Sequence, residues 1–270
     1  MAYNPSFGVD VQGQLWVAGS YASSGQPQVA AWQIARDGEQ LTVSEPRILN
    51  SVLGEEQLSY NAFTISPDAT YVAAGYGDDL SASPAIQIWS LKRDTKPLVV
   101  YGHQERINDL TFSPDGRVLV TASGYTSEFH PGEDNGVRLW RVERNPTRLT
   151  ELARFMTELQ ADDVAFSPNG RLVVGNDYRG DLVVWDTVTG DEVAKLSGRF
   201  YSVTFAPDNS LLVAGDAYGG IHLFDTHSWQ EVKVLYGHIG GIDYLAFDPQ
   251  GEVLASSGND GTMRLWGVSR

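Results

Sequence analysis

One short phrase recurs along this chain, and its spacing constrains the fold more than any other feature. The phrase reads TISPDA, TFSPDG, AFSPNG, TFAPDN and AFDPQG in its five copies. The prolines of these copies are separated by 47, 54, 39 and 42 positions: Pro67, Pro114, Pro168, Pro207 and Pro249. A sixth, degenerate copy, VDVQG, opens the chain at residues 9–13. Self-similarity at this period indicates an array of equal structural units.

Each unit has the same order of elements. The phrase itself predicts a tight turn, because proline presets φ while aspartate and glycine favour a reversal of the chain. An apolar run follows, then a third strand that ends in an aromatic residue, and then a weaker fourth strand. The apolar runs occupy residues 15–18, 72–74, 118–120, 172–174, 211–214 and 253–255. The aromatic residues are Trp32, Trp89, Trp140, Trp185, Phe224 and Trp266. The weaker strands fall at 41–49, 97–101, 149–155, 193–196 and 232–235. Nearly continuous apolar runs indicate strands buried on both faces, so we predict an all-β fold of small sheets, each wedged between its neighbours.

These units resemble the repeats of the WD40 family across essentially the whole chain. The Trp-Asp signature is literal at Trp185-Asp186, and the Gly-His element occurs at Gly102-His103 and Gly237-His238. The resemblance implies a β-propeller of six blades in a single domain over residues 1–270, with seven blades only if more chain exists. The expected repeats are 1–36, 37–93, 94–145, 146–189, 190–228 and 229–270.

The resemblance also implies a buried hydrogen-bonded network in two of the repeats. It joins a histidine, a hydroxyl residue, an aspartate and the tryptophan. One expected set is His103, Thr121 or Ser123, Asp134 and Trp140; the other is His238, Ser256 or Ser257, Asp260 and Trp266. We interpret these residues as structural rather than as catalytic dyads, because no nucleophile motif such as Gly-X-Ser-X-Gly accompanies them. We expect no cofactor and no resident metal.

Composition narrows the classes of partner. The chain has 34 acidic and 19 basic residues, a net charge of −15, which disfavours nucleic acid and anionic membrane surfaces. It has no cysteine, so disulfide frameworks and thiolate metal sites are excluded. The first residues lack a signal-peptide pattern and no apolar run is long enough to cross a bilayer, so we expect a soluble cytoplasmic protein.

The loops between the second and third strands are expanded in the first three units, at residues 20–27, 76–84 and 124–134. Equivalent loops of a propeller emerge on one face, so we expect a raised crescent of exposed aromatic and acidic residues that binds a protein. Its members are Tyr21, Tyr76, Asp78, Asp79, Leu80, Tyr125, Glu128, Phe129, His130 and Glu133. Two alternatives stay open. Surface insertions also occur without function, and Asp78, Asp79, Glu128, Glu133 and Asp134 also suit a calcium ion, although their spacing fits no EF-hand.

A second candidate surface lies where the first strands begin. Polar residues there would line one mouth of the central channel and attract a basic peptide: Asn61, Asp109, Asp163 and Asp243, with Asn108, Asp162 and Tyr201 beside them. The alternative is that these side chains satisfy backbone groups near the strand starts.

The last unit stops four residues after Trp266, and only residues 1–6 precede the first strand. We therefore expect the last blade to have three strands and an open edge available for assembly with another chain, or the sequence to be a module of a longer polypeptide.

The function that these features favour is a scaffold that binds partner proteins or peptides on a propeller face, without catalysis. One alternative is a sensing or docking domain of a larger regulatory protein. A second is a propeller enzyme with its site in the central channel, which would need acids, histidines or a metal to converge there.

Overall fold

The computed structural model describes residues 6–267 except residues 24–25, 38–39, 51–59, 78–83, 94, 125, 128–129, 132–135, 145–146, 157–160 and 178. The described residues form strands and turns, and no helix occurs among them. The chain divides into two compact units, residues 1–156 and 157–270, which we describe separately.

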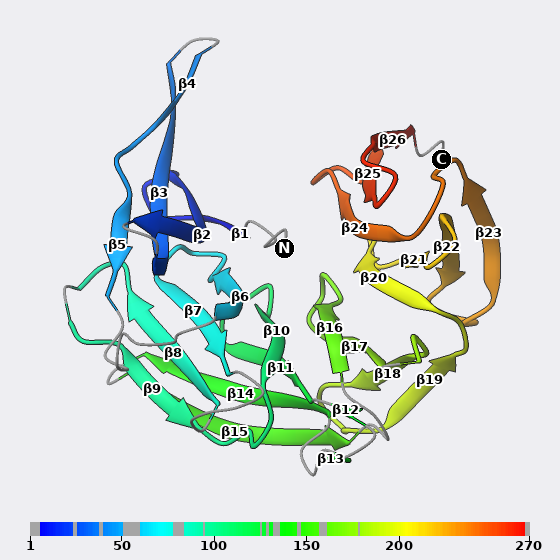
Figure 1. Ribbon diagram of the computed structural model, residues 1–270, viewed down its shortest axis with the longest axis horizontal. Coiled ribbons are helices and arrows are strands. Elements are labelled where there is room, and N and C mark those ends of the chain that lie inside the picture. The colour runs from blue at the N-terminus through cyan, green and yellow to red at the C-terminus, as the bar shows by residue number, and fades with distance from the viewer. Residues whose placement is uncertain are drawn as a thin grey trace. The chain divides into compact units, whose positions relative to one another are not determined.

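The first unit contains three antiparallel sheets, which we call blades 1 to 3 (Figure 1). Blade 1 comprises β1 (Ser6–Val9), β2 (Leu15–Ser23), β3 (Gln26–Asp37), β4 (Gln40–Val43) and β5 (Arg47–Leu49). Blade 2 comprises β6 (Tyr60–Ile65), β7 (Tyr71–Tyr76), β8 (Ala85–Ser90) and β9 (Leu98–Tyr101). Blade 3 comprises β10 (Ile107–Phe112), β11 (Val118–Ser123), β14 (Gly136–Arg144) and β15 (Thr147–Met156). A separate two-stranded hairpin, β12 (Thr126–Ser127) with β13 (His130–Pro131), lies between β11 and β14 in the sequence.

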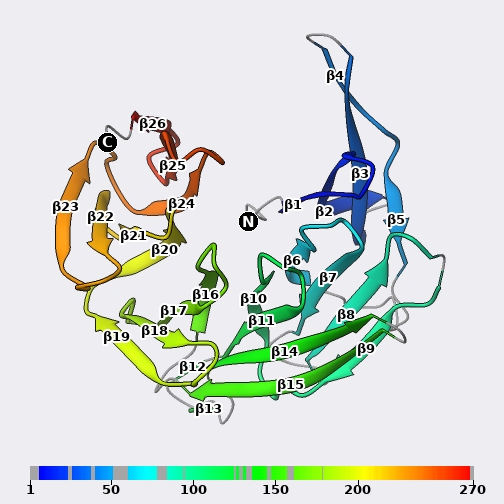
Figure 2. The same ribbon diagram turned by 180° about the vertical axis from the view of Figure 1, so that it is seen from behind.

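The second unit contains blades 4 to 6, seen from both sides in Figures 1 and 2. Blade 4 comprises β16 (Ala161–Phe166), β17 (Leu172–Asp177), β18 (Leu182–Asp186) and β19 (Glu192–Leu196). Blade 5 comprises β20 (Phe200–Phe205), β21 (Leu211–Asp216), β22 (Gly220–Asp225) and β23 (Glu231–Tyr236). Blade 6 comprises β24 (Ile242–Phe247), β25 (Val253–Gly258) and β26 (Met263–Gly267). Six small antiparallel sheets in sequential order give the fold class of a six-bladed β-propeller.

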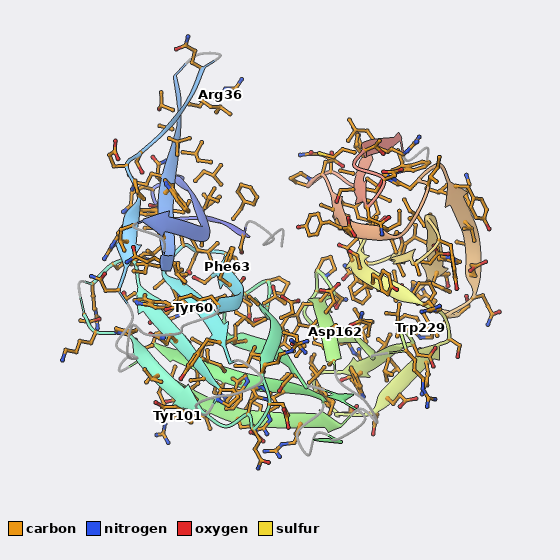
Figure 3. The ribbon with its side chains drawn as sticks, in the orientation of Figure 1. Arg36, Tyr60, Phe63, Tyr101, Asp162 and Trp229 are labelled. Carbon is orange, nitrogen blue, oxygen red and sulfur yellow. The ribbon has the colours of Figure 1, made fainter. Side chains whose placement is uncertain are left out.

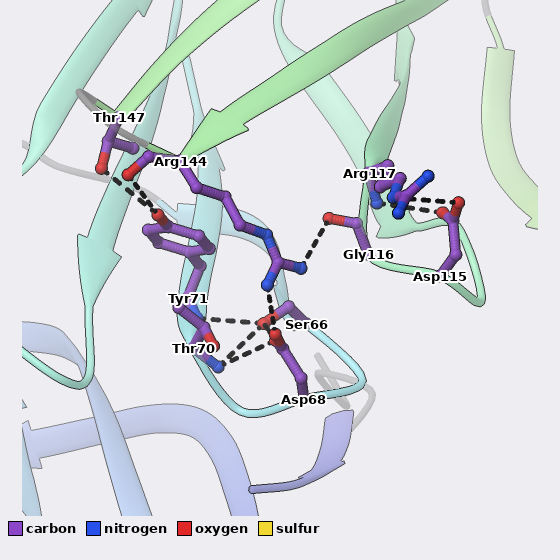
Figure 4. Close-up of polar contacts among 9 residues, drawn as sticks. All are labelled: Ser66, Asp68, Thr70, Tyr71, Asp115, Gly116, Arg117, Arg144 and Thr147. Atoms are coloured by element: carbon purple, nitrogen blue, oxygen red, sulfur yellow. Dashed lines mark hydrogen bonds and ion pairs between the residues drawn. The ribbon is translucent and has the colours of Figure 1, made fainter. Parts of the chain in front are cut away.

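The recurring phrase forms the turn between the first and second strands of each blade. In blade 2, the Ser66 Oγ donates a hydrogen bond to Asp68 Oδ1 at 2.8 Å and accepts one from the Tyr71 N–H at 3.0 Å (Figure 4). The last residue of the phrase is left-handed in all six turns, with φ between 46° and 79°. Five of these six residues are glycine or asparagine, which tolerate that conformation; Ala69 is the sixth.

Successive blades of one unit pack face to face through apolar side chains. Ile86 and Ile88 of blade 2 share a buried cluster with Ile107 and Leu110 of blade 3. The approach is close, because a Cβ added at Gly75 would lie 2.5 Å from a side-chain carbon of Ile107. Blades 4 and 5, and blades 5 and 6, share similar clusters. The continuous apolar runs of the sequence therefore reflect strands covered on both faces, as predicted.

Two details of the predicted strands are corrected. Residues 20–27 are not a wide loop, because β2 and β3 continue as a long hairpin in which Ser20 pairs with Val29 and Ser23 with Gln26. The single strand predicted at 41–49 is divided into β4 and β5, and both pair with β3. β4 is exposed along its whole length and extends away from β1 in both views (Figures 1 and 2).

The sequence repeats and the blades are offset by one strand. β5 belongs to the predicted repeat 37–93, but it pairs with β3 of the repeat before it. β9 likewise falls in the predicted repeat 94–145 and pairs with β8. Each blade thus takes its outermost strand from the beginning of the next repeat, which leaves the last repeat with three strands among the described residues.

Candidate protein-interaction surfaces

The two predicted hydrogen-bonded networks are built around a buried hydroxyl group. In blade 3, the Thr121 Oγ lies 2.7 Å from His103 Nε2 and accepts a hydrogen bond from the Trp140 indole N–H at 2.9 Å. His103, Thr121 and Trp140 are all buried. Of the two hydroxyls considered from the sequence, Thr121 occupies this position, whereas the Ser123 hydroxyl donates to the Glu105 carbonyl. Asp134 lies outside the described residues.

Blade 6 repeats this arrangement with serine in place of threonine. The Ser256 Oγ lies 2.8 Å from His238 Nε2 and accepts from the Trp266 N–H at 2.9 Å. The carboxylate of Asp260 lies 3.1 Å from His238 Nδ1 and accepts the Ile239 N–H at 2.9 Å. This backbone hydrogen bond, with those from Thr262 and His238, holds the pKa of Asp260 well below its ordinary value. Both ring nitrogens of His238 are engaged within the blade, which is the structural role that we inferred.

Blade 5 has a different histidine cluster at its edge. His222 Nδ1 lies 2.7 Å from Glu231 Oε2, and its Nε2 lies 3.0 Å from Asp216 Oδ2. Burial favours the neutral ring, but the hydrogen bonds to Glu231 and Asp216 outweigh it and raise the pKa of His222. The His222–Glu231 pair joins β22, the third strand, to β23, the fourth strand. This cluster therefore also stabilises the blade.

The predicted loop crescent lies largely outside the described residues. The members that lie outside the described residues are Asp78, Asp79, Leu80, Tyr125, Glu128, Phe129 and Glu133. Tyr21 lies in β2 and His130 in β13, each as a strand residue. Tyr76 was predicted to be exposed, and this is wrong: it is 6% exposed and belongs to the core cluster of blades 1 and 2. Tyr76 is the last residue of β7 and precedes the loop, so its ring packs into the core. Burial raises the pKa of its hydroxyl.

The predicted channel-mouth residues lie at a recurring irregularity of the first strand. The register shifts between the first and second strands in blades 2 to 6, and a residue at this shift leaves the regular alternation. Asn61, Asp109, Asp163 and Asp243 all lie at or beside this bulge.

Their partners differ from blade to blade. Asp163 accepts the Val203 N–H at 3.1 Å, as the backbone alternative predicts, whereas Asp243 is exposed. Asn108 donates to the Gly124 carbonyl at 3.0 Å, and Asp162 lies beside Asp163 on β16 (Figure 3).

In the described part of the chain, no three His, Asp or Glu side chains are grouped closely enough to hold a metal ion. Within that part, no helix is long and apolar enough to cross a membrane.

An exposed cluster of side chains in the second unit was anticipated from the sequence only through Tyr201. We call it the tyrosine patch, and it comprises Arg199, Tyr201, Tyr218, Tyr236 and Ile239. The Arg199 guanidinium donates to the Tyr218 hydroxyl at 3.1 Å and lies 5.9 Å from its ring centre. Gly219 closely approaches the His238 carbonyl beside Ile239, and Gly241 lies against the Tyr201 ring.

The patch therefore joins the blade 5 loop to the segment that enters blade 6. Tyr218 is 69% exposed, Tyr236 77% and Ile239 84%. The sequence signal for the patch was the presence of large side chains in two connections, Tyr218 and Ile239, where polar residues are usual; Tyr236 ends β23 beside them.

The comparisons with known proteins agree with this architecture. The family model described as "WD domain, G-beta repeat" matches residues 95–141 and 229–267. These two segments contain the networks of His103 and His238.

Several relatives match over much of the chain. It is 25% identical over 238 residues to serine-threonine kinase receptor-associated protein of Gallus gallus, which covers 87% of this chain and 59% of that protein. It is 27% identical over 178 residues to eukaryotic translation initiation factor 3 subunit I of Nematostella vectensis, covering 66% of this chain and 43% of that protein. It is 25% identical over 227 residues to apoptotic protease-activating factor 1 of Danio rerio, covering 80% of this chain and 17% of that protein.

The chain thus spans 59% and 43% of the lengths of the first two relatives. The family model thus matches two WD40 repeats of this chain, and the repeat motifs, the six blades and the similar proteins agree with a β-propeller of the WD40 type.

Proposed function

We propose that this chain is a non-catalytic scaffold that holds partner proteins, and that the tyrosine patch is one of its binding surfaces. The observation that carries the proposal is the combination of Tyr201, Tyr218, Tyr236 and Ile239 with Arg199 at one end of two adjacent blades. Tyrosine and arginine are enriched at the centres of protein interfaces, because a rigid ring or a planar guanidinium gives a large contact area at low entropic cost.

The names of the relatives support an associative role. One relative is named as a receptor-associated protein and another as a subunit of an initiation factor. By similarity to them, we propose that this chain also acts in contact with other proteins. The match to a small part of apoptotic protease-activating factor 1 favours a second candidate role, that of a docking domain within a longer polypeptide. An immunoblot of the native protein separates the two roles by its size.

The alternative of an enzyme with a central-channel site has less support. His103, His238 and His222 each make hydrogen bonds that fasten their own blades. We also propose the acidic channel-mouth residues as a contact region for a basic peptide. The loop crescent, without Tyr76, is proposed as a further contact region for a protein. A cytoplasmic location likewise remains a proposal.

Site-specific crosslinking tests the tyrosine patch, because two equally exposed residues occupy opposite ends of their blades. Ile239 and Val188 are both 84% exposed. Ile239 lies in the connection into the first strand of blade 6, whereas Val188 lies in the turn from the third to the fourth strand of blade 4. In an antiparallel blade these two kinds of connection lie at opposite ends.

We expect a photocrosslinker at residue 239, introduced into the native protein in its own cells, to form discrete adducts that the same group at residue 188 does not form. The substitutions Tyr218→Ser and Tyr201→Ser should reduce these adducts without altering thermal unfolding by more than a few degrees. Equal adduct patterns at both residues, or adducts that persist in the double variant, would remove the patch from the proposal.

A further inference from the structure

One pocket of the first unit differs in charge from the rest of this acidic chain. It lies where β5 of blade 1 meets the connection between β8 and β9 of blade 2, and its volume is about 290 Å³. Arg47 of β5 and Arg93 and Lys96 of the connection line it, and no aspartate or glutamate is among the described residues that do so. The whole chain has 34 acidic and 19 basic residues, so this lining departs from its composition.

The walls of the pocket are held in place by the core and by hydrogen bonds. Leu49 and Trp89 belong to one buried cluster, so β5 packs against β8. The Trp89 indole N–H donates to the Asn50 carbonyl at 2.9 Å, and the Arg47 guanidinium donates to the Leu91 carbonyl. Because a guanidinium has five N–H donors, the half-buried Arg47 is oriented by this bond and keeps donors for a ligand.

A serine in place of an aspartate explains why this part of blade 2 lacks a carboxylate. The residue after the aromatic residue of the third strand is Asp186 in blade 4 and Asp225 in blade 5. Each carboxylate accepts the N–H groups two and three residues later, at 2.8 to 3.1 Å. In blade 2 this residue is Ser90, whose hydroxyl oxygen accepts the Lys92 and Arg93 N–H groups at 3.3 and 3.2 Å. The turn is kept, and the negative charge is absent.

The cations around this turn therefore have no aspartate at that place to pair with. In blade 4, the Asp186 carboxylate accepts a hydrogen bond from Arg171 at 3.0 Å. Among the described residues, Arg47 and Lys96 have no carboxylate partner, and the Ser90 hydroxyl hydrogen has no acceptor. Two cations and a hydroxyl group that line the pocket thus retain donors for an anion.

We propose that this pocket binds a phosphoryl group. A phosphomonoester carries a charge of about −1.5 to −2 at pH 7 and three acceptor oxygens, so it matches several cations and a hydroxyl better than a carboxylate does. The planar donor fork of arginine suits such an anion. The volume lies near the lower limit of about 300–1,000 Å³ for pockets of drug-sized ligands, so it suits the phosphoryl group and the few atoms that carry it.

Two sources of this group fit the pocket. It reaches the cations either as a free phosphate compound or on a phosphorylated side chain of another protein, in which case Ile48 and Pro97 of the lining contact the atoms that carry it. A nucleic-acid backbone is disfavoured, because the net charge of −15 repels an extended polyanion, whereas a single phosphoryl group needs only the local cations. The pocket lies in the first unit and does not rest on the tyrosine patch, which lies in the second.

Phosphorus NMR titration of the intact chain, in phosphate-free buffer at physiological salt, tests the proposal. The probes are N-acetyl-phosphoserine methylamide and inorganic phosphate, and N-acetyl-glutamate methylamide, followed by proton NMR, is the carboxylate control. We expect saturable binding of the phosphoserine probe, with the glutamate control weaker by about tenfold or more, the range for a lost hydrogen bond between charged groups. Tighter binding of the phosphoserine probe than of inorganic phosphate identifies a side chain as the source, and equal binding identifies a free phosphate compound.

Two variants test whether the pocket is the place of binding. Ser90→Asp gives blade 2 the aspartate of blades 4 and 5, so the turn and the thermal unfolding should be preserved while binding weakens by about tenfold or more. Lys96→Glu should weaken binding by a similar factor, and because Lys96 is exposed this variant should fold as the parent does. Lys195→Glu, the reversal of an exposed lysine in blade 4, is the matched control and should bind as the parent does.

Three results would overturn the proposal. The first is absence of saturable binding by both phosphorus probes, and the second is binding of the glutamate control as tight as that of the phosphoserine probe. The third is binding that Ser90→Asp and Lys96→Glu leave unchanged, because the phosphoryl group would then lie elsewhere on the chain. None of these results bears on crosslinking at residue 239, so the tyrosine patch and this pocket fail or stand independently.

Discussion

Blades 3 and 6 have the same interior and different edges. Both contain a histidine, a hydroxyl and a tryptophan in one hydrogen-bonded network, with similar distances. In blade 3 a fourth strand covers the third, Arg138 is 3% exposed and Trp140 is buried. In blade 6 the third strand is the outermost strand among the described residues, Arg264 is exposed and Trp266 is only partly buried. The comparison shows that the network forms within three strands, whereas the carboxylate partner of the third-strand arginine in blade 3 comes from the fourth strand.

The largest difference between the two blades should appear on removing the tryptophans. Trp140→Ala should destabilise the fold by about 3–5 kcal/mol, the range for losing a large buried ring. Trp266→Ala should cost less, because Trp266 is only partly buried against its core cluster. Chemical denaturation of both variants measures the two losses, and equal losses would contradict the difference in burial.

A second difference concerns the charged pair between the third and fourth strands. Glu151→Leu leaves the buried Arg138 guanidinium without its carboxylate, so we expect a loss of about 2–3 kcal/mol, below the about 3–5 kcal/mol of fully buried pairs because Glu151 is partly exposed. Arg264→Met in blade 6 should change stability by less than about 0.5 kcal/mol, as exposed substitutions usually do. The same denaturation experiment tests both, and a large loss in Arg264→Met would mean that its charge is already paired.

The shared network should respond alike in the two blades. Thr121→Val and Ser256→Ala each remove the acceptor of an indole N–H and a hydrogen-bond partner of a histidine. Each should therefore cost about 2 kcal/mol, the typical penalty for a buried polar group left unsatisfied. A double-mutant cycle with the corresponding histidine isolates the network energy. Full additivity in one blade and coupling in the other would show that the two networks are not equivalent.

The smallest expected effect is on pH dependence in blade 6. The pKa of Asp260 is lowered in the folded protein, so its ionised form stabilises the fold above the ordinary aspartate pKa of 3.8. This contribution is lost progressively as the pH falls below that value toward the folded pKa. The gap in melting temperature between the parent chain and Asp260→Asn should be constant above about pH 5 and narrow below pH 4. A gap that widens on acidification would reverse the sign of this linkage.

Much of the fold was predictable from periodicity and turn chemistry. The six turn phrases, the apolar runs and the six aromatic residues placed the first three strands of each blade, because they depend on local conformation and on burial between sheets. The outermost strands were less predictable. Their exposed residues carry a weaker pattern, and residues 41–49 divide at Pro46 into two strands.

The candidate surfaces were predicted less well than the core. The hydrogen-bonded networks follow from side-chain types at fixed places in the repeat, whereas exposure depends on where a strand ends. Tyr76 was assigned to a loop, but β7 extends through it and buries its ring.

Hydrogen–deuterium exchange tests most directly whether a fourth strand is what distinguishes blade 3 from blade 6. β14 pairs with both β11 and β15, whereas β26 pairs with β25 alone among the described residues. We therefore expect the amides of residues 263–267 that do not bond to β25 to exchange rapidly, and the amides of residues 136–142 to be protected. Equal protection of the two strands in the isolated chain would contradict the account.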